Sequence, residues 1–150
     1  MSIAAGKSRG APSGENAAAT QPFVHSVRVY YEDTDAAGVV YYANYLKFME
    51  RARTEWLAAK GFPLAELEAA YGIVFVVSRA EINFRAPARL GDELAVSVEP
   101  IERGRARLVV RQDARRGADV IASARVTLGC LDRKAWRPTR MPDVLLENLA

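Results

Sequence analysis

The chain has 150 residues, of which 50% are hydrophobic and 26% charged, and its formal net charge is +3 at pH 7. This length and balance predict one compact globular domain rather than two. The single cysteine, Cys130, excludes an internal disulfide, and the single histidine, His25, excludes a histidine-rich metal centre. We therefore expect no metal and no cofactor. The mild, dispersed charge is also unlike that of a nucleic-acid-binding protein, so we expect no nucleic-acid partner.

Apolar stretches and cysteine content bear on the cellular location of the protein. No stretch reaches the ~18 apolar residues of a membrane span, and residues 1–22 lack the apolar core of a secretory signal. A lone thiol fits a reducing compartment, so we predict a cytoplasmic protein. Residues 1–22 are mostly Ala, Gly, Ser, Pro and Thr, a composition that predicts a disordered extension. The folded domain is then expected over residues 23–150.

The first part of that domain predicts a strand, a loop and a long helix. Apolar and polar residues alternate over 24–31, which is typical of a strand, and a polar loop follows at 32–38. A helix is expected from about residue 44 to residue 60, with Asn44 as N-cap and Gly61 just past the end. Its apolar stripe comprises Tyr45, Met49, Ala52, Trp56 and Ala59.

The second part predicts strands. Pro63 opens and Gly72 closes a shorter helix. Four alternating runs follow, at 79–85, 93–99, 105–112 and 120–131. The short connections between them predict antiparallel pairing, and residues 141–149 are expected to form a terminal helix. This order indicates an α+β fold in which the long helix lies against the apolar face of a curved antiparallel sheet of about five strands.

The loop before the long helix has an unusual concentration of acids. Glu32, Asp33 and Asp35 lie within four positions, shortly before Gly38. Like charges this close repel one another unless they are solvated or used. A helix N-terminus offers unpaired N–H groups, and a carboxylate beside such groups suits acyl transfer, because it attacks or activates water while the N–H groups stabilise the oxyanion. The alternative is that the acids only solvate a loop.

The segment VRVYYEDTDAAGVVYYANYLKFMERARTEWL resembles the signature of acyl-CoA thioesterases with the hotdog fold. It is most similar to the branch associated with the Tol-Pal envelope system, whose sister branch is the 4-hydroxybenzoyl-CoA thioesterases. The resemblance runs from about Val27 to Pro138. It implies a long central helix wrapped by an antiparallel sheet, a homodimer that assembles into a homotetramer, and an acyl-CoA substrate. It favours the catalytic interpretation of the acidic loop.

The resemblance also implies roles for individual residues. Asp35 matches the catalytic carboxylate, acting as nucleophile or general base, and Tyr31 matches a tyrosine placed beside it. The backbone N–H of Tyr42, near the helix start, matches the oxyanion donor. Gly38 matches a glycine whose missing Cβ lets the backbone approach the thioester.

A second group of residues concerns the phosphates of coenzyme A. Arg103 and Arg105 occupy the hairpin where the aromatic-acyl branch keeps basic phosphate contacts, so they are the predicted substrate-binding residues. The alternative is a solvated hairpin, because arginine is common on exposed turns.

One position departs from the Tol-Pal branch. Most of its members have a histidine, proposed to assist the carboxylate, where this chain has Tyr42, and tyrosine at this position resembles the 4-hydroxybenzoyl-CoA branch. His25 lies ten residues before Asp35, ahead of the predicted first strand, and is not expected to replace it.

The function predicted from these residues is hydrolysis of short-chain acyl-CoA thioesters to the free acid and coenzyme A. One alternative is an aromatic, 4-hydroxybenzoyl-type acyl-CoA thioesterase. Another is a mainly non-catalytic partner of acyl carrier protein or of the envelope Tol-Pal system. The sequence does not set the acyl chain length, because the depth of the pocket depends on how the subunits pack.

Overall fold

The computed structural model describes residues 21–149, so the predicted disordered extension at 1–22 falls almost wholly outside the described residues. The elements in chain order are β1 (Phe23–Arg28), the 3₁₀ helix η1 (Tyr31–Asp33), α1 (Asn44–Ala59), α2 (Leu64–Tyr71), β2 (Ile73–Phe84), β3 (Glu93–Arg103), β4 (Arg107–Arg116), β5 (Asp119–Asp132) and α3 (Asp143–Asn148).

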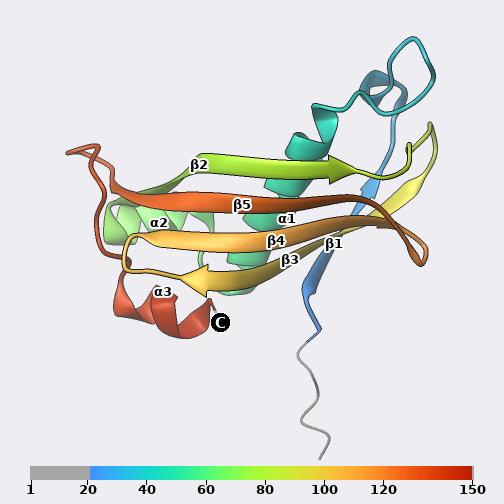
Figure 1. The fold of residues 1–150 in the computed structure, drawn as a ribbon. Helices are drawn as coiled ribbons and strands as arrows, with labels where there is room; N and C mark the ends of the chain where they lie inside the picture. Colours follow the sequence, from blue (N-terminus) through green and yellow to red (C-terminus); the bar gives the residue numbers. More distant parts are fainter. Residues whose placement is uncertain (1–20, 150) are drawn as a thin grey trace, which may run out of the picture.

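The strands form one sheet in the order β1-β3-β4-β5-β2, and each neighbouring pair is antiparallel. The sheet curves around α1, which lies behind it in Figure 1 and packs mainly against β1 and β3. This arrangement confirms the predicted α+β fold with a long helix against a five-stranded antiparallel sheet. Strands β1 and β2 form the two edges.

The long helix buries a wider face than the predicted stripe. Its buried residues are Tyr45, Phe48, Met49, Ala52, Arg53, Trp56 and Leu57. Ala59 of the predicted stripe is exposed. The face is wider because the curved sheet touches the helix along more than one line, so positions beside the stripe, such as Phe48 and Leu57, are also buried.

Three local predictions were wrong. The first strand ends at Arg28 rather than at residue 31, because the chain turns into η1. Because β1 begins at Phe23, His25 lies inside the strand, opposite Val96, and not ahead of it. The N-cap of α1 is Ala43, while Asn44 is the first helical residue.

A buried polar link fastens α1 to the sheet. Arg53 Nη1 donates a hydrogen bond of 2.8 Å to Gln112 Oε1 on β4. The amide of Gln112 donates in turn to the carbonyl oxygens of Met49, at 3.0 Å, and Ser97, at 3.3 Å. Burial lowers the pKa of Arg53 from its ordinary value, against the opposing effect of Glu50. Gln112 on β4 thus satisfies polar groups on both α1 and β3.

Replacing Gln112 by leucine tests this link. We expect Gln112→Leu to lower the free energy of unfolding by about 1–3 kcal/mol, because it removes the acceptor of the buried Arg53 guanidinium and a donor to two carbonyl groups. Chemical denaturation at fixed protein concentration measures the change. The double variant with Arg53→Met should lose less than the sum of the two single losses. Additive losses would contradict the link.

Candidate active site

The loop between β1 and α1 is closed by Asp33. Its carboxylate accepts the backbone N–H of Tyr30 at 2.8 Å. Its carbonyl oxygen accepts the backbone N–H of Tyr41 at 2.9 Å and the side-chain amide of Asn44 at 2.9 Å. Asp33 is only 8% exposed. One of the three clustered acids is therefore structural, which the sequence interpretation did not anticipate.

Asp35 lies in the tight turn at the tip of this loop. Its N–H donates to Val39 O at 2.9 Å, and its carbonyl oxygen accepts the Gly38 N–H at 2.9 Å. Its Oδ1 accepts the Ala37 N–H at 2.9 Å, which fixes the direction of the carboxylate. The side chain is exposed in the single protomer.

Gly38 has a φ of +78°, a conformation that favours glycine, and an added Cβ would meet no described atom within 4 Å. The turn itself therefore explains the glycine. The predicted close approach of a thioester at this position stays a prediction.

The segment after β2 supports the loop from the other side. The N–H of Val40 donates to Ala88 O at 2.8 Å. The N–H of Ala88 donates to the hydroxyl of Tyr45 at 3.2 Å. Burial raises the pKa of Tyr45, which outweighs the opposing effect of that hydrogen bond, so the phenol stays neutral. The loop is thus held both by η1 and by the chain that follows β2.

Two backbone N–H donors, those of Tyr42 and Ala43, lie directly before α1. The N–H of Tyr41 is used by Asp33, and that of Asn44 donates to Tyr41 O at 2.8 Å. Among the residues that the structure describes, the N–H groups of Tyr42 and Ala43 have no acceptor. Donors that are fixed in place but unpaired, at the positive end of a helix, are what an oxyanion site requires.

An aromatic cup of about 290 Å³ adjoins these donors, lined by Val40, Tyr42, Tyr45, Phe84, Arg85, Ala86 and Pro87. The rings of Tyr42 and Phe84 meet edge to face, with centroids 6.1 Å apart. The ring of Tyr41 lies 4.9 Å from that of Tyr42, and the neighbouring Tyr42 side chain raises the pKa of Tyr41. The sequence interpretation missed Phe84, because on its predicted strand nothing distinguishes it from a core residue.

Tyr31 lies on η1 and is 82% exposed. The Thr34 hydroxyl donates to its carbonyl oxygen at 2.7 Å. Over residues 21–149 no hydrogen bond joins Tyr31 to Asp35, although the two residues lie on the same loop.

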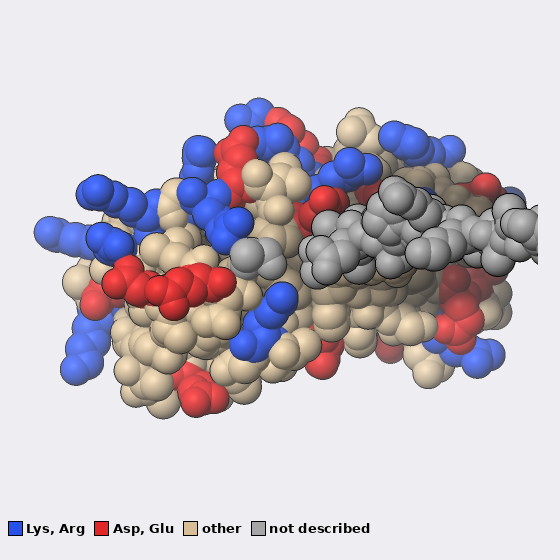
Figure 2. Space-filling view, turned by 90° about the horizontal axis from the view of Figure 1, so that it is seen from below, with Lys and Arg blue, Asp and Glu red and all other residues tan. Residues whose placement is uncertain are grey.

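Arg103 and Arg105 lie at the opposite end of the sheet from Asp35. The loop bridges to Arg89, just before β3 begins, whereas Arg103 is the last residue of β3. At about 3.3 Å per residue, this strand separates the two ends by roughly 30 Å. Figure 2 shows Lys and Arg side chains gathered at the left end, which carries the β3–β4 turn in Figure 1. One protomer therefore does not bring these arginines to its own Asp35.

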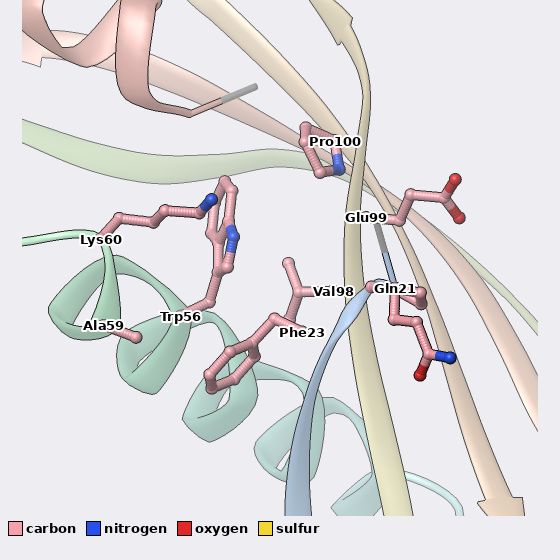
Figure 3. Close-up of a pocket in the computed structure, with 9 residues that line it drawn as sticks. Gln21, Phe23, Trp56, Ala59, Lys60, Val98, Glu99 and Pro100 are labelled. Carbon is pink, nitrogen blue, oxygen red and sulfur yellow. The ribbon is translucent and has the colours of Figure 1, made fainter. Parts of the chain in front are cut away.

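A larger cavity lies away from the loop. It has a volume of about 480 Å³ and lies between the C-terminal half of α1 and the edge strand β1. Figure 3 shows Trp56 on α1 facing Val98 on β3 and Phe23 on β1. None of the predicted site residues lines it. Within residues 21–149, no His, Cys, Asp or Glu side chains are grouped as a metal site, and no helix there is long and apolar enough to span a bilayer.

Comparison with known proteins identifies the family of the chain. The thioesterase-like superfamily matches residues 29–149. The acyl-CoA thioesterase YbgC of Haemophilus influenzae is 40% identical over 120 residues, which cover 80% of this chain and 88% of the relative. The 1,4-dihydroxy-2-naphthoyl-CoA hydrolase of Thermosynechococcus vestitus is 33% identical over 118 residues, covering 78% of this chain and 81% of that protein.

A solved structure is also similar. The crystal structure of a probable thioesterase from Bartonella henselae superposes with a TM-score of 0.77 and 33% identity, covering 81% of this chain and all 100% of that one. The fold is therefore the hotdog fold, as the resemblance implied, and the chain belongs to the thioesterase-like superfamily. Within that class it is an enzyme, a thioester hydrolase.

Proposed function

We propose that the protein hydrolyses short-chain acyl-CoA thioesters, with Asp35 as nucleophile or general base and the Tyr42 N–H as oxyanion donor. The observation that carries this proposal is the unpaired N–H of Tyr42, because it lies on the same closed loop as the Asp35 carboxylate. The relative from Haemophilus influenzae, an acyl-CoA thioesterase, supports the substrate class.

The chemistry requires few groups. As general base, the Asp35 carboxylate takes a proton from water, and the hydroxide oxygen attacks the thioester carbon. As nucleophile, the carboxylate attacks that carbon itself, and water then hydrolyses the anhydride. In both routes the carbonyl oxygen becomes negative and the Tyr42 N–H stabilises it. The C–S bond breaks to release the coenzyme A thiolate, a good leaving group, so no histidine is needed at position 42.

Asp35→Asn tests the assignment. We expect the variant to fold normally and to lose at least ~10²-fold in kcat, a loss of the size found for key catalytic groups. Steady-state hydrolysis of a short acyl-CoA measures the change. The matched control is Glu32→Gln, which removes an exposed acid from the same loop and should keep near-normal turnover. Normal turnover in Asp35→Asn would rule out the assignment.

The assembly we propose is a homodimer paired through β2, which further assembles into a homotetramer. Strand β2 is an edge strand with β5 as its partner, and its outer part exposes Val77 and Phe84. A groove of about 660 Å³ runs beside it, lined on α1 by Leu46 and on β2 by Val77 and Ala80. An unpaired edge with exposed apolar residues favours pairing with a second copy.

This assembly gives the predicted arginines a role. A two-fold pairing of β2 edges is antiparallel, so the start of one β2 lies beside the end of the other. The partner's Arg103 and Arg105 then come to the end of the molecule that carries Asp35. We propose that they meet the coenzyme A phosphates across the dimer interface.

The double variant Arg103→Gln/Arg105→Gln tests this role. We expect KM for acyl-CoA to rise severalfold while kcat stays within about twofold, because ground-state and transition-state binding fall together. In the wild type, KM should rise with ionic strength, and this dependence should flatten in the variant. Arg28→Gln, an exposed arginine on β1, is the control. An unchanged KM would remove both arginines from the site.

A second candidate is an aromatic acyl-CoA thioesterase. The aromatic cup of Tyr42, Tyr45 and Phe84 favours it, since flat rings stack well against such walls. The 1,4-dihydroxy-2-naphthoyl-CoA hydrolase of Thermosynechococcus vestitus also supports it. Comparing kcat/KM for acetyl-CoA and for benzoyl-CoA separates the two candidates.

Location and protein partners are proposed on the resemblance. We propose a cytoplasmic protein that works beside acyl carrier protein or the Tol-Pal envelope system. Affinity capture with purified acyl carrier protein and with Tol-Pal components tests these partners separately from hydrolysis.

A further inference from the structure

Residues 87–92, which directly precede β3, hold the start of the loop between β1 and α1 (the Asp35 loop). The Val29 N–H donates to Asp92 O at 2.9 Å, and the Gly91 N–H donates to Val29 O at 3.0 Å. Val29 is the first residue after β1 and is only 1% exposed. The beginning of the loop is therefore fixed to the 87–92 segment by two backbone hydrogen bonds.

The same segment holds the end of the loop. The Val40 N–H donates to Ala88 O at 2.8 Å. The preceding residue, Val39, forms an isolated antiparallel bridge with Arg89. Both stems of the loop thus bind one short stretch of chain, so a shift of the 87–92 segment moves the whole loop.

The segment is also a wall of the aromatic cup. Pro87 lines the cup, and the Ala88 N–H donates to the hydroxyl of Tyr45, another cup residue, at 3.2 Å. The 87–92 segment therefore joins the two halves of the candidate site, the cup on one side and the loop that carries Asp35 on the other.

Arg116, the last residue of β4, closes the 87–92 segment at both ends. Its Nη1 donates to Pro87 O at 3.0 Å and to Asp92 Oδ2 at 2.8 Å. The same Oδ2 accepts the Arg89 N–H at 2.8 Å. In Figure 1 the Asp35 loop, the start of β3 and the turn between β4 and β5 lie at the same end of the sheet. One guanidinium nitrogen thus joins the first and the last residue of the segment.

The ion pair of Arg116 with Asp92 is partly shielded from water. The two side chains are 38% and 25% exposed. The Arg89 N–H and then the Arg116 guanidinium lower the pKa of the Asp92 carboxyl, so the carboxylate is charged near neutral pH. Hydrogen bonds between charged groups are shorter and stronger than those between neutral groups. The pair is therefore suited to hold the segment in one position.

We propose that Arg116 is a positioning residue for thioester hydrolysis, which sets the place of the Asp35 loop against the aromatic cup by fixing the 87–92 segment. This inference rests on the proposed function, and it takes the acyl group to lie in the cup. Within residues 21–149, the Arg116 side chain makes no hydrogen bond with the loop itself, so it acts through the segment. A misplacement of about 1 Å by a change far from the chemistry can cost roughly 10²-fold in rate.

Arg116→Met tests the role, because methionine keeps part of the aliphatic chain and removes both hydrogen bonds. We expect kcat for a short acyl-CoA to fall about tenfold, because Asp35 is then misaligned with the acyl carbon. We expect KM to change by less than about threefold, because ground-state binding does not depend on that alignment. The matched control is Arg115→Met. Arg115 is similarly exposed, at 44%, but pairs with Asp113 outside the segment, so its loss should leave kcat within about twofold.

Two further variants separate positioning from a general loss of stability. Arg116→Lys keeps the positive charge and several N–H donors, so kcat should return to within about threefold of the wild type. Asp92→Asn removes the carboxylate charge and should lower kcat by a factor similar to that of Arg116→Met. The double variant Arg116→Met/Asp92→Asn should lose no more than the larger single loss, because both changes open the same link.

Amide hydrogen exchange measures the link without catalysis. In Arg116→Met, the Val40 amide, which donates to Ala88 O, should exchange at least about tenfold faster than in the wild type. Amides in the middle of α1 should exchange at unchanged rates. The Arg115→Met control should leave the Val40 amide as protected as it is in the wild type.

Three results would overturn the inference: wild-type kcat in Arg116→Met, no recovery of kcat in Arg116→Lys, or unchanged exchange of the Val40 amide. If Arg116→Met does not fold, Asp92→Asn carries the same measurements. Asp35→Asn is assayed alongside. Lost turnover in Asp35→Asn with normal turnover in Arg116→Met contradicts this inference alone, whereas normal turnover in Asp35→Asn contradicts the proposed function.

Discussion

Three hydrogen bonds at Asp33 hold the candidate site together. The carboxylate fixes the start of the loop at Tyr30, and the carbonyl oxygen fixes its end at Tyr41 and the start of α1 at Asn44. Because the same residue closes the loop at both ends, the Asp35 carboxylate and the Tyr42 N–H belong to one rigid unit. Donors held in this way need no reorganisation when charge develops on a substrate oxygen. The buried carboxylate of Asp33 thus supports the loop that carries the exposed carboxylate of Asp35.

The periodic parts of the fold were predictable from sequence. Alternating runs gave β3, β4 and β5, and Gly72 ends α2 with the left-handed conformation expected of a C-terminal glycine. Side-chain contacts between distant residues were not predictable. The end of β1 and the N-cap of α1 were both misplaced, because Asp33 draws the chain into η1 and binds the Asn44 amide. The hydrogen bond between Arg53 and Gln112 likewise cannot be predicted from the spacing of residues in the sequence.

The residues of the candidate site likewise differ in how far the sequence predicts them. Asp35 and Tyr42 are predicted from a motif that is continuous in sequence, and the structure places both on one loop. Phe84 is isolated in sequence, and its place in the aromatic cup became visible only in the structure. Arg103 and Arg105 lie at the far end of the same sheet. The proposed pairing of β2 edges would reconcile these positions, since each subunit would then offer its basic end to the Asp35 loop of the other.

The central claim is that the Tyr42 N–H binds the oxygen of a thioester carbonyl beside Asp35. The most direct test is NMR of the ¹⁵N-labelled protein with a ketone analogue of acetyl-CoA, in which CH₂ replaces the thioester sulfur. The account predicts that the Tyr42 amide proton moves downfield and becomes protected from exchange, while the Tyr41 amide, already bonded to Asp33, changes little. Saturating binding that leaves the Tyr42 amide unchanged and exchanging freely would contradict it.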